Sequence, residues 1–324
     1  MKTKKLLSII LTIFVVNLSF ISALSVSAQT TEGYFNKGVQ VVSELKDIVQ
    51  TDEKQTNEFI IKNKEDFSKF MITSEYWEND YKVTLACDID MQGEVFNSIE
   101  TFNGQFDGVG HTVSNISFKC FVENNHGTIS DVKFNGGNLI NGSECGFVFN
   151  NEEDGLIVCC SVDNMNSEGA NIKSGFVCIN RGKITNSKTT FSFKNIYDGL
   201  GGFVDENYGT IEECVATGNV IGFIDIGGFV GYNGGTINNC IAAGNVTGNQ
   251  YIGGFVGQNY GGTITGCIVT GNAIGGEAGG FVGENVQGTI TNCIAKGDVN
   301  GEKISLERFV GSNNYGKIED CKVG

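Results

Sequence analysis

A short phrase built around phenylalanine and valine recurs about every 26 residues through most of this chain. Its clearest copy is Gly228-Phe229-Val230-Gly231, and eight Phe-Val pairs align from Phe121-Val122 to Phe309-Val310. A period of this length, sustained over many copies, indicates stacked units that each bury an apolar face against their neighbours. The repeat therefore constrains the fold more than any other feature of the sequence.

Each copy combines short β-branched runs with glycine and asparagine and shows no helical periodicity. Such runs predict strands joined by turns. Three short strands with three turns fill about 26 residues, the size of one coil of a solenoid. We therefore predict an all-β fold, a parallel β-helix (β-solenoid) of about nine coils over residues 81–324, with a small N-terminal helical cap.

An asparagine stands four residues after the phenylalanine in every copy. Coils stack about 4.8 Å apart, so this residue can hydrogen-bond its equivalents above and below. A structural role in the turns is favoured over ligand binding. The predicted asparagine ladder consists of Asn125, Asn151, Asn180, Asn207, Asn233, Asn259, Asn285 and Asn313.

Side-chain alternation along a strand predicts that phenylalanine and valine point in opposite directions. With the phenylalanines in the core, the valines would form a long apolar stripe facing solvent, and such stripes often mark interaction surfaces. Outward valine could also serve β-propensity alone, or be covered by the N-terminal segment. The predicted interaction stripe consists of Val122, Val148, Val177, Val204, Val230, Val256, Val282 and Val310.

Cysteine recurs at one repeat position about a dozen residues after the phenylalanine. Val132 and Ser187 occupy this position in other copies, so a small buried side chain suffices there. We predict a column of buried thiols, with some oxidised pairs as the alternative, because parallel side chains suit a disulfide poorly. The column comprises Cys160, Cys214, Cys240, Cys267, Cys293 and Cys321, and the residues that follow it, Val215, Ile241, Ile268 and Ile294, would then point outward.

Two segments precede the repeats. Residues 1–28 join lysines, an apolar run and a small-residue cleavage pattern, which predicts a secretory signal peptide and a secreted or cell-surface protein. No later run is long and apolar enough to predict a membrane span. Residues 29–80 are expected to form the cap, with helices over residues 37–50 and from Lys64 to Phe70 covering the first coil's open edges.

The chain ends within a coil, at residues 316–324. This predicts end-to-end self-association at an uncapped C-terminus, blunting of the last edge by Lys317 and Lys322, or truncation from a longer protein.

The phrase from Gly228 to Ile237 resembles the GLUG motif of bacterial surface proteins, and Asp88-Ile89-Asp90 with Phe106–His111 is similar to the start of their repeat regions. The resemblance covers about residues 80–324. GLUG repeats accompany adhesin-like proteins and the non-catalytic part of secreted immunoglobulin-cleaving metallopeptidases. The resemblance therefore implies a β-helical fold at a bacterial surface, and it implies no reaction.

Composition excludes several kinds of function. A formal net charge of −15 disfavours nucleic acid as a partner. The two histidines, His111 and His126, are too far apart for a His-Glu-x-x-His zinc site, and His111 is expected to be structural. No nucleophile elbow or phosphate-binding loop is present. We predict no catalytic, cofactor-binding or metal-binding residues.

A solenoid of this composition is compatible with several functions. A non-enzymatic protein for adhesion or scaffolding, binding an unknown protein or glycan at the cell surface, is favoured. A glycan-processing enzyme would need paired carboxylates, for which Asp205, Glu206, Glu212, Glu213, Asp225, Glu277 and Glu284 supply material. Ice binding would need a regular threonine array, and Lys183 and Lys317 interrupt the one available. A truncated non-catalytic repeat region of a larger protein is a further alternative.

Overall fold

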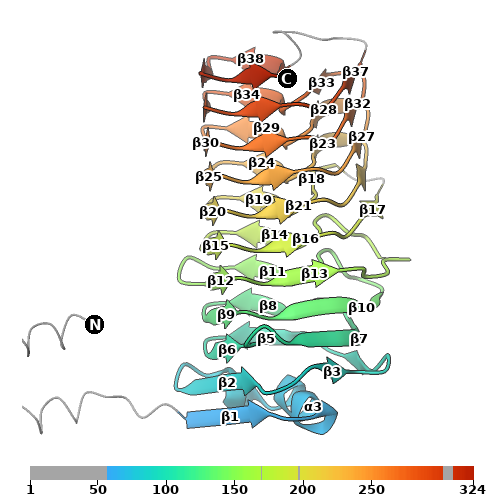
Figure 1. The fold of residues 1–324 in the computed structure, drawn as a ribbon, viewed down its shortest axis with the longest axis vertical. Helices are drawn as coiled ribbons and strands as arrows, with labels where there is room; N and C mark the ends of the chain where they lie inside the picture. The colour runs from blue at the N-terminus through green and yellow to red at the C-terminus, as the bar shows by residue number, and fades with distance from the viewer. Residues whose placement is uncertain (1–56, 169, 196–197, 302–308) are drawn as a thin grey trace, which may run out of the picture. The chain divides into compact units, whose positions relative to one another are not determined.

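The repeats form a tall stack of coils in a computed structural model of the chain (Figure 1). The structure describes residues 57–324 except 169, 196–197 and 302–308. The expected signal peptide and the expected helix over residues 37–50 lie outside these residues. Successive strands pair in parallel and in register from coil to coil. The predicted all-β parallel solenoid is confirmed, with about ten turns. Within the described part, no helix is long and apolar enough to cross a membrane.

Three long sheets run along the stack. Sheet A contains β1 (Asn57–Ile61), β2 (Tyr81–Leu85), β6 (Gln105–Asp107), β9 (Thr128–Ser130), β12 (Leu156–Val158), β15 (Lys183–Thr185), β20 (Thr210–Glu212), β25 (Thr236–Asn238), β30 (Thr263–Thr265), β35 (Thr289–Thr291) and β39 (Lys317–Glu319). Sheet B contains β3 (Ile89–Asp90), β4 (Val95–Phe96), β7 (Thr112–Phe118), β10 (Lys133–Leu139), β13 (Ser161–Asp163), β16 (Lys188–Thr189), β21 (Val215–Ala216), β26 (Ile241–Ala242), β31 (Ile268–Val269), β36 (Ile294–Ala295) and β40 (Lys322–Val323). Sheet C contains β5 (Ile99–Phe102), β8 (Val122–Asn125), β11 (Val148–Asn151), β14 (Val177–Asn180), β19 (Val204–Asn207), β24 (Val230–Asn233), β29 (Val256–Tyr260), β34 (Val282–Val286) and β38 (Val310–Asn314).

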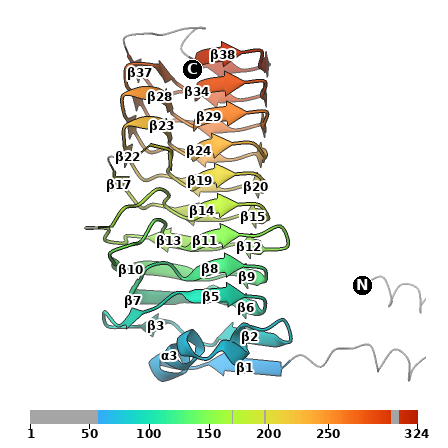
Figure 2. The ribbon, with the colours of Figure 1, turned by 180° about the vertical axis from the view of Figure 1, so that it is seen from behind.

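Two shorter sheets complete the later coils, so these coils have five sides. Sheet D contains β18 (Leu200–Gly201), β23 (Ile224–Gly227), β28 (Gln250–Gly253) and β33 (Ala278–Gly279). Sheet E contains β17 (Phe193–Lys194), β22 (Val220–Ile221), β27 (Val246–Thr247), β32 (Ala273–Ile274) and β37 (Val299–Asn300). A later coil therefore runs from sheet C through A, B, E and D, and the next coil begins again on sheet C (Figure 2).

A helix closes the first coil, as expected. Helix α3 (Lys64–Ile72) begins at Asn63, whose side chain accepts a 2.8 Å hydrogen bond from the backbone of Asp66. Its buried face includes Phe70, whose ring stacks 5.2 Å from that of Phe106 in the core. A single 3₁₀ turn, η1 (Ser74–Trp77), follows. Strand β1 precedes the helix and pairs with β2, so the solenoid begins before the boundary expected at residue 81.

The core contains the predicted phenylalanine stack and asparagine ladder. The Phe203 and Phe229 rings are 4.9 Å apart and tilted by 6°, which matches the coil spacing. In the ladder, each side-chain amide donates a 2.8 Å hydrogen bond to the next asparagine, from Asn125 through to Asn313. The ladder is confirmed, and it satisfies amide groups that burial would otherwise leave unpaired.

The predicted exposure of the valine stripe is wrong, because all eight valines are fully buried. The chain bends between phenylalanine and valine, so the two side chains share a face. The backbone amides of Phe229 and Val230 both donate to the carbonyl of Phe255, at 2.9 and 3.0 Å. Neighbouring amides of an extended strand point in opposite directions, so this shared acceptor shows where alternation fails. The corrected residues are Val122, Val148, Val177, Val204, Val230, Val256, Val282 and Val310.

Alternation fails a second time one residue later. Val230 pairs with Val256 and Tyr232 with Gln258, whereas Gly231 is skipped in the register. This irregularity leaves Tyr232 partly exposed and Asn233 buried. At these glycines sheet D packs directly on the backbone of sheet C: a side chain on Gly257 would meet the carbonyl group of Asp225. The glycines of the phrase are therefore required for contact between two layers.

The cysteine column is buried, as predicted, except for Cys321 in the last coil, which is half-buried, and all eleven cysteines are free thiols. In the repeating coils, the backbone amide of one cysteine donates to the sulfur of the next, at 3.3 Å between Cys240 and Cys267. The Cys240 thiol itself donates a 3.2 Å hydrogen bond to the carbonyl of Asn238 in its own coil. Before each column position the chain makes a left-handed turn, at Asn239 in this coil. Cys159 occupies that turn in an earlier coil, which explains its place beside Cys160.

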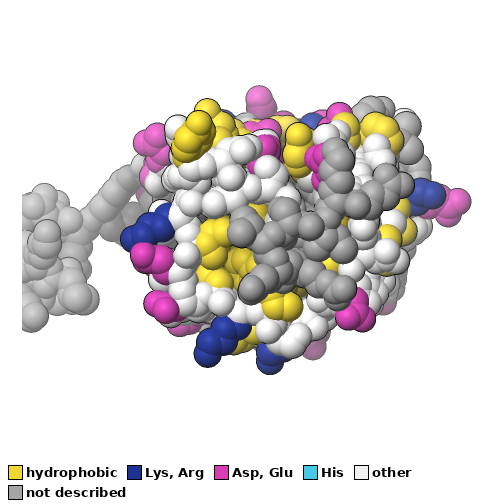
Figure 3. All heavy atoms as spheres, turned by 90° about the horizontal axis from the view of Figure 1, so that it is seen from above, with side chains coloured by type: hydrophobic (Ala, Val, Ile, Leu, Met, Phe, Trp, Pro, Cys, Tyr) yellow, Lys and Arg dark blue, Asp and Glu magenta, His cyan; other side chains and the backbone are white. Residues whose placement is uncertain are grey.

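Figure 3 looks along the stack onto the last coil, where hydrophobic side chains appear among polar ones. Ile318 and Cys321 are half-buried there, whereas Ile290 and Cys293 one coil below are fully buried. No strand covers the last coil within the described ranges. End-to-end self-association at this end stays a prediction.

Candidate interaction surface

Exposed aliphatic side chains line the outer surfaces of sheets B and E. Ile241 is 38% exposed, Ile221 40% and Ile274 42%. The outward direction predicted for the residues that follow the cysteine column is confirmed, because Ile241 is exposed and its three equivalents are half-buried. We call this surface the isoleucine face; it comprises Val215, Ile241, Ile268 and Ile294 on sheet B with Ile221 and Ile274 on sheet E.

The centre of the isoleucine face carries no charged side chain. Each coil presents four outward residues, such as Val215, Thr217, Asn219 and Ile221, and the next two coils repeat the arrangement with aliphatic, threonine, alanine or asparagine residues. Charged residues stand only beyond these three coils, at Lys188 and Lys194 on one side and at Lys296, Asp298 and Lys322 on the other. An apolar, uncharged area of this regularity is unusual in a chain of net charge −15.

A second asparagine ladder fixes the corner between sheets B and E. The Asn219 side chain accepts a 2.8 Å hydrogen bond from the backbone of Asn245, and Asn245 accepts one of 3.0 Å from Asn272. Asn272 in turn accepts from Asp298 at 2.8 Å. The isoleucine columns on either side are therefore held at fixed spacing, which lowers the entropy that a partner must remove on binding.

A tyrosine column lies on a different part of the surface. The Tyr208 and Tyr232 rings are 5.8 Å apart and those of Tyr232 and Tyr260 are 6.4 Å apart. The Tyr208 hydroxyl donates a 2.8 Å hydrogen bond to Glu206. Burial and then this bond raise the pKa of Tyr208 to about 12. The column is short, and the Tyr208 hydroxyl, its best hydrogen-bond donor, is already bonded to Glu206.

The acids considered for catalysis do not form one cluster. Asp205 is buried where later coils have glycine, and burial raises the pKa of its carboxyl well above the usual value. Burial, followed by repulsion from Asp198 and Glu284, raises the pKa of Asp225 to about 6. Glu212 instead forms a 2.6 Å ion pair with Lys183, which lowers its pKa.

Asp225 gives a pH-dependent prediction. Its pKa is higher in the folded chain than the usual 3.8, so folding is favoured below about pH 4 and that gain disappears as pH rises through 6. Asp225→Asn should therefore stabilise the protein by about 1 kcal/mol at pH 8, after allowance for its partial exposure, and by much less at pH 4. Thermal unfolding at the two pH values measures this difference. The exposed Glu153→Gln serves as control, and an equal effect of Asp225→Asn at both pH values would contradict the prediction.

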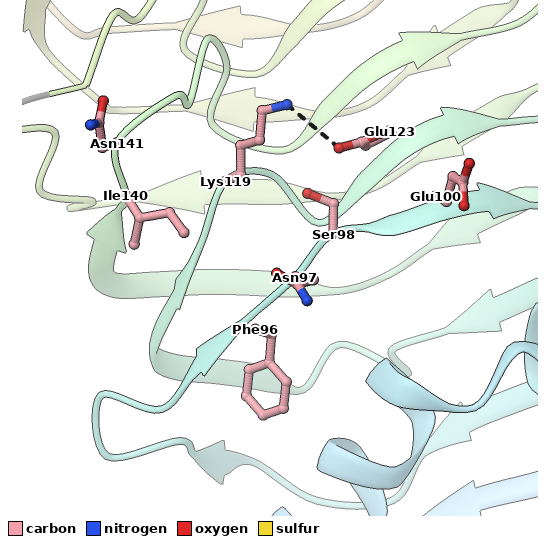
Figure 4. Close-up of a pocket in the computed structure, with 8 residues that line it drawn as sticks. All are labelled: Phe96, Asn97, Ser98, Glu100, Lys119, Glu123, Ile140 and Asn141. Atoms are coloured by element: carbon pink, nitrogen blue, oxygen red, sulfur yellow. Dashed lines mark ion pairs between the residues drawn. The ribbon is translucent and has the colours of Figure 1, made fainter.

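A surface pocket of about 320 Å³ lies near the second and third coils (Figure 4). Lys119 and Glu123 form a 3.5 Å ion pair across part of it. The carboxylates named above are not among its lining residues, which are Phe96, Asn97, Ser98, Glu100, Lys119, Glu123, Ile140 and Asn141.

Each histidine pairs with an aspartate of a neighbouring coil. His111 lies 3.1 Å from Asp88 and His126 lies 2.8 Å from Asp154. Asp88 also accepts a 2.8 Å hydrogen bond from the backbone of Thr112, which fits a structural role for this corner. Within the described ranges, no group of three or more His, Cys, Asp or Glu side chains is arranged to hold a metal ion.

Comparison with known proteins identifies the repeat. The family described as "The GLUG motif" matches residues 248–275 and 274–300, which are two successive coils. The chain carries GLUG repeats. Each matched GLUG segment contains one Phe-Val pair, with its ladder asparagine, and two residues of the isoleucine face.

Among solved structures, the chain is similar to a candidate immunoglobulin A1 protease from Bacteroides ovatus. The identity is 18%, over 82% of this chain and 75% of that chain, with a TM-score of 0.39. A similarity this weak supports no inference about activity. No protein with a curated description matches the chain.

Proposed function

We propose that this GLUG-repeat chain is a secreted, non-enzymatic protein for adhesion or scaffolding at a bacterial surface, and that it binds its partner through the isoleucine face. The observation that carries the proposal is the run of exposed or half-buried aliphatic side chains over successive coils, with no outward charge in the central three coils. Exposed contiguous apolar area often marks an interaction surface.

The chemistry of the isoleucine face favours a protein partner over a glycan. Isoleucine and valine offer no hydrogen-bond donor or acceptor to sugar hydroxyls, whereas they match an uncharged apolar protein surface. Because the corner asparagines already hold the columns in place, association requires little rearrangement of the chain. Secretion rests on the signal peptide expected at residues 1–28.

Binding to immobilised fibrinogen, fibronectin and collagen, and to a glycan array, tests the proposal on the chain without residues 1–28. Replacing Ile241, Ile268 and Ile274 together with threonine keeps β-branching but removes apolar area. We expect affinity for the bound protein to fall on the order of tenfold. A matched variant changes Thr236, Thr263 and Thr289 on sheet A to alanine and should bind normally.

Two outcomes would contradict the proposal. Binding that survives the isoleucine replacements but fails in the sheet A variant would place the partner on another face. Release of sugar from a polysaccharide by the purified chain would contradict the non-enzymatic assignment.

A further inference from the structure

Three buried cysteines form a cluster separate from the phenylalanine core. Cys120, Cys145 and Cys178 are each at most 2% exposed and pack together beside Phe149 and Ile179. They lie where the chain enters sheet C. In later coils, glycine occupies this part of the coil. Cys178, for example, stands where a later coil has Gly231. The cluster therefore fills a gap that glycines close further along the stack.

Cys145 lies at the centre of the cluster. It packs with Cys120 and Cys178 in this cluster and is fully buried. Cys120 directly precedes Phe121, whereas Cys145 is separated from Phe147 by Gly146. The two cysteines therefore stand at non-equivalent positions of successive coils. Their side chains are therefore free of the parallel stacking that makes the cysteine column unsuited to disulfides.

Two neighbours of Cys120 line the pocket shown in Figure 4, although Cys120 itself is not among its lining residues. Its sulfur is 3.3 Å from the Ser98 hydroxyl, and its backbone amide donates to the same oxygen at 3.3 Å. It also follows Lys119 in the chain, and both Ser98 and Lys119 line the pocket. A small molecule in this pocket would contact Ser98, which touches the Cys120 sulfur, whereas Cys145 is fully buried.

The two thiols differ in acidity in the direction that exchange chemistry needs. Hydrogen bonding from Cys145, then from Ser98, with the nearby Lys119 ammonium, lowers the pKa of Cys120. Burial, the largest cause, raises the pKa of Cys145 well above its usual value. The thiolate is the reacting form of cysteine, so Cys120 is the better nucleophile.

We propose that Cys120 and Cys145 are a redox-active dithiol pair, in which Cys120 exchanges with a low-molecular-mass disulfide that enters the pocket. The Cys120 thiolate attacks one sulfur of that disulfide, forms a mixed disulfide and releases the first small thiolate. Cys145 then loses its proton and attacks the Cys120 sulfur, which forms the Cys120–Cys145 bond and releases the second. Two protein thiols are oxidised, and one external disulfide is reduced to two thiols.

Oxidised glutathione is the probe for the test. The purified chain is equilibrated with it, the remaining thiols are alkylated, and the protein is cleaved after lysine, arginine and glutamate. Such cleavage places Cys120, Cys145 and Cys178 on three separate peptides, and Cys159 with Cys160 on a fourth. We expect two of the eleven thiols to be lost and the Cys120 and Cys145 peptides to be joined. With the reduced protein, iodoacetamide should label Cys120 before Cys145.

Variants separate this pair from its neighbours. The Cys120–Cys145 link should persist in Cys178→Ser and disappear in Cys145→Ser, where Cys120 should stop at the mixed disulfide with glutathione. The column cysteine Cys267 should stay alkylatable throughout and serves as an internal control. Full alkylation of both Cys120 and Cys145 in the wild-type chain, or a bond between Cys145 and Cys178 instead, would overturn the proposal without any variant having to fold.

Discussion

Replacing Gly253 with alanine is expected to destabilise the protein by about 3 kcal/mol or more. An added Cβ would overlap the carbonyl oxygen of Val256 and lie 2.6 Å from its carbon, and it would lie 2.8 Å from the backbone nitrogen of Gly283 in the next coil. All of these are backbone atoms, so no side-chain rotation can relieve the overlap. Strands β28 and β29 would have to separate, and each is bonded to a neighbour on either side.

Gly234→Ala is the matched control for this prediction. Gly234 also belongs to a GLUG phrase, but its added Cβ would lie 3.4 Å from the Tyr208 ring, an ordinary contact distance. Both changes restrict the unfolded chain to the same extent. The difference between their free energies of unfolding in urea therefore isolates the clash. Equal stability of the two variants would show that sheets C and D do not touch at Gly253.

The sequence predicted the parts of the coil that depend on one residue type at one repeat position. Asparagine recurs without exception four residues after phenylalanine, and a buried amide needs a partner, so the ladder could be inferred without knowing the path of the chain. The cysteine column followed in the same way, because Val132 and Ser187 replace cysteine only by other small side chains. Both inferences use stacking, which the period alone establishes.

The direction of the valines could not be inferred, because it depends on a bend that strand periodicity does not encode. The shared carbonyl acceptor of Phe229 and Val230 shows the bend, but its only signal in the sequence is a glycine on either side of the pair. Glycine is abundant in this chain, at 46 residues, so that signal is weak. The prediction for Ile241 succeeded because no such bend interrupts the step from Cys240.

Contacts between non-adjacent segments were missed for a related reason. Two such contacts are the packing of sheet D on sheet C and the packing of Cys120 with Cys145. Both depend on how the chain turns between coils. The residues are about one repeat apart at non-equivalent positions, so alignment of the copies does not bring them together. A weak signal existed in the early coils, where Cys178 and Asp205 replace the glycine of the later phrase.

These observations separate structure from function within the repeat. The recurring residues of the phrase are all used internally: glycine, in the later coils, for the contact between layers, phenylalanine and valine for the core, and asparagine for the ladder. Under the proposed function, binding specificity would reside at outward positions, which vary. The isoleucine face lies between the cysteine and the next phenylalanine, in the part of each coil that the phrase does not constrain.

Replacing Asn233 with alanine is expected to cost about 4 kcal/mol, because it breaks the ladder at a fully buried position. Asn233 accepts a 2.8 Å hydrogen bond from Asn207 and donates one of 2.8 Å to Asn259. Its loss leaves one buried donor and one buried acceptor without their ladder partners, and each such group costs about 1–3 kcal/mol. A smaller cavity cost adds to this.

The end of the ladder supplies the control. Asn313 is only half-buried and accepts from Asn285 without a further asparagine to donate to, so Asn313→Ala should cost no more than about half as much. Urea unfolding, followed by circular dichroism, measures both. Hydrogen exchange should show faster opening of the coils on either side of Asn233, because each coil is held by its two neighbours. If both variants lose the same stability, the hydrogen bonds between ladder asparagines do not stabilise the fold. The repeated asparagine would then be required for turn conformation alone.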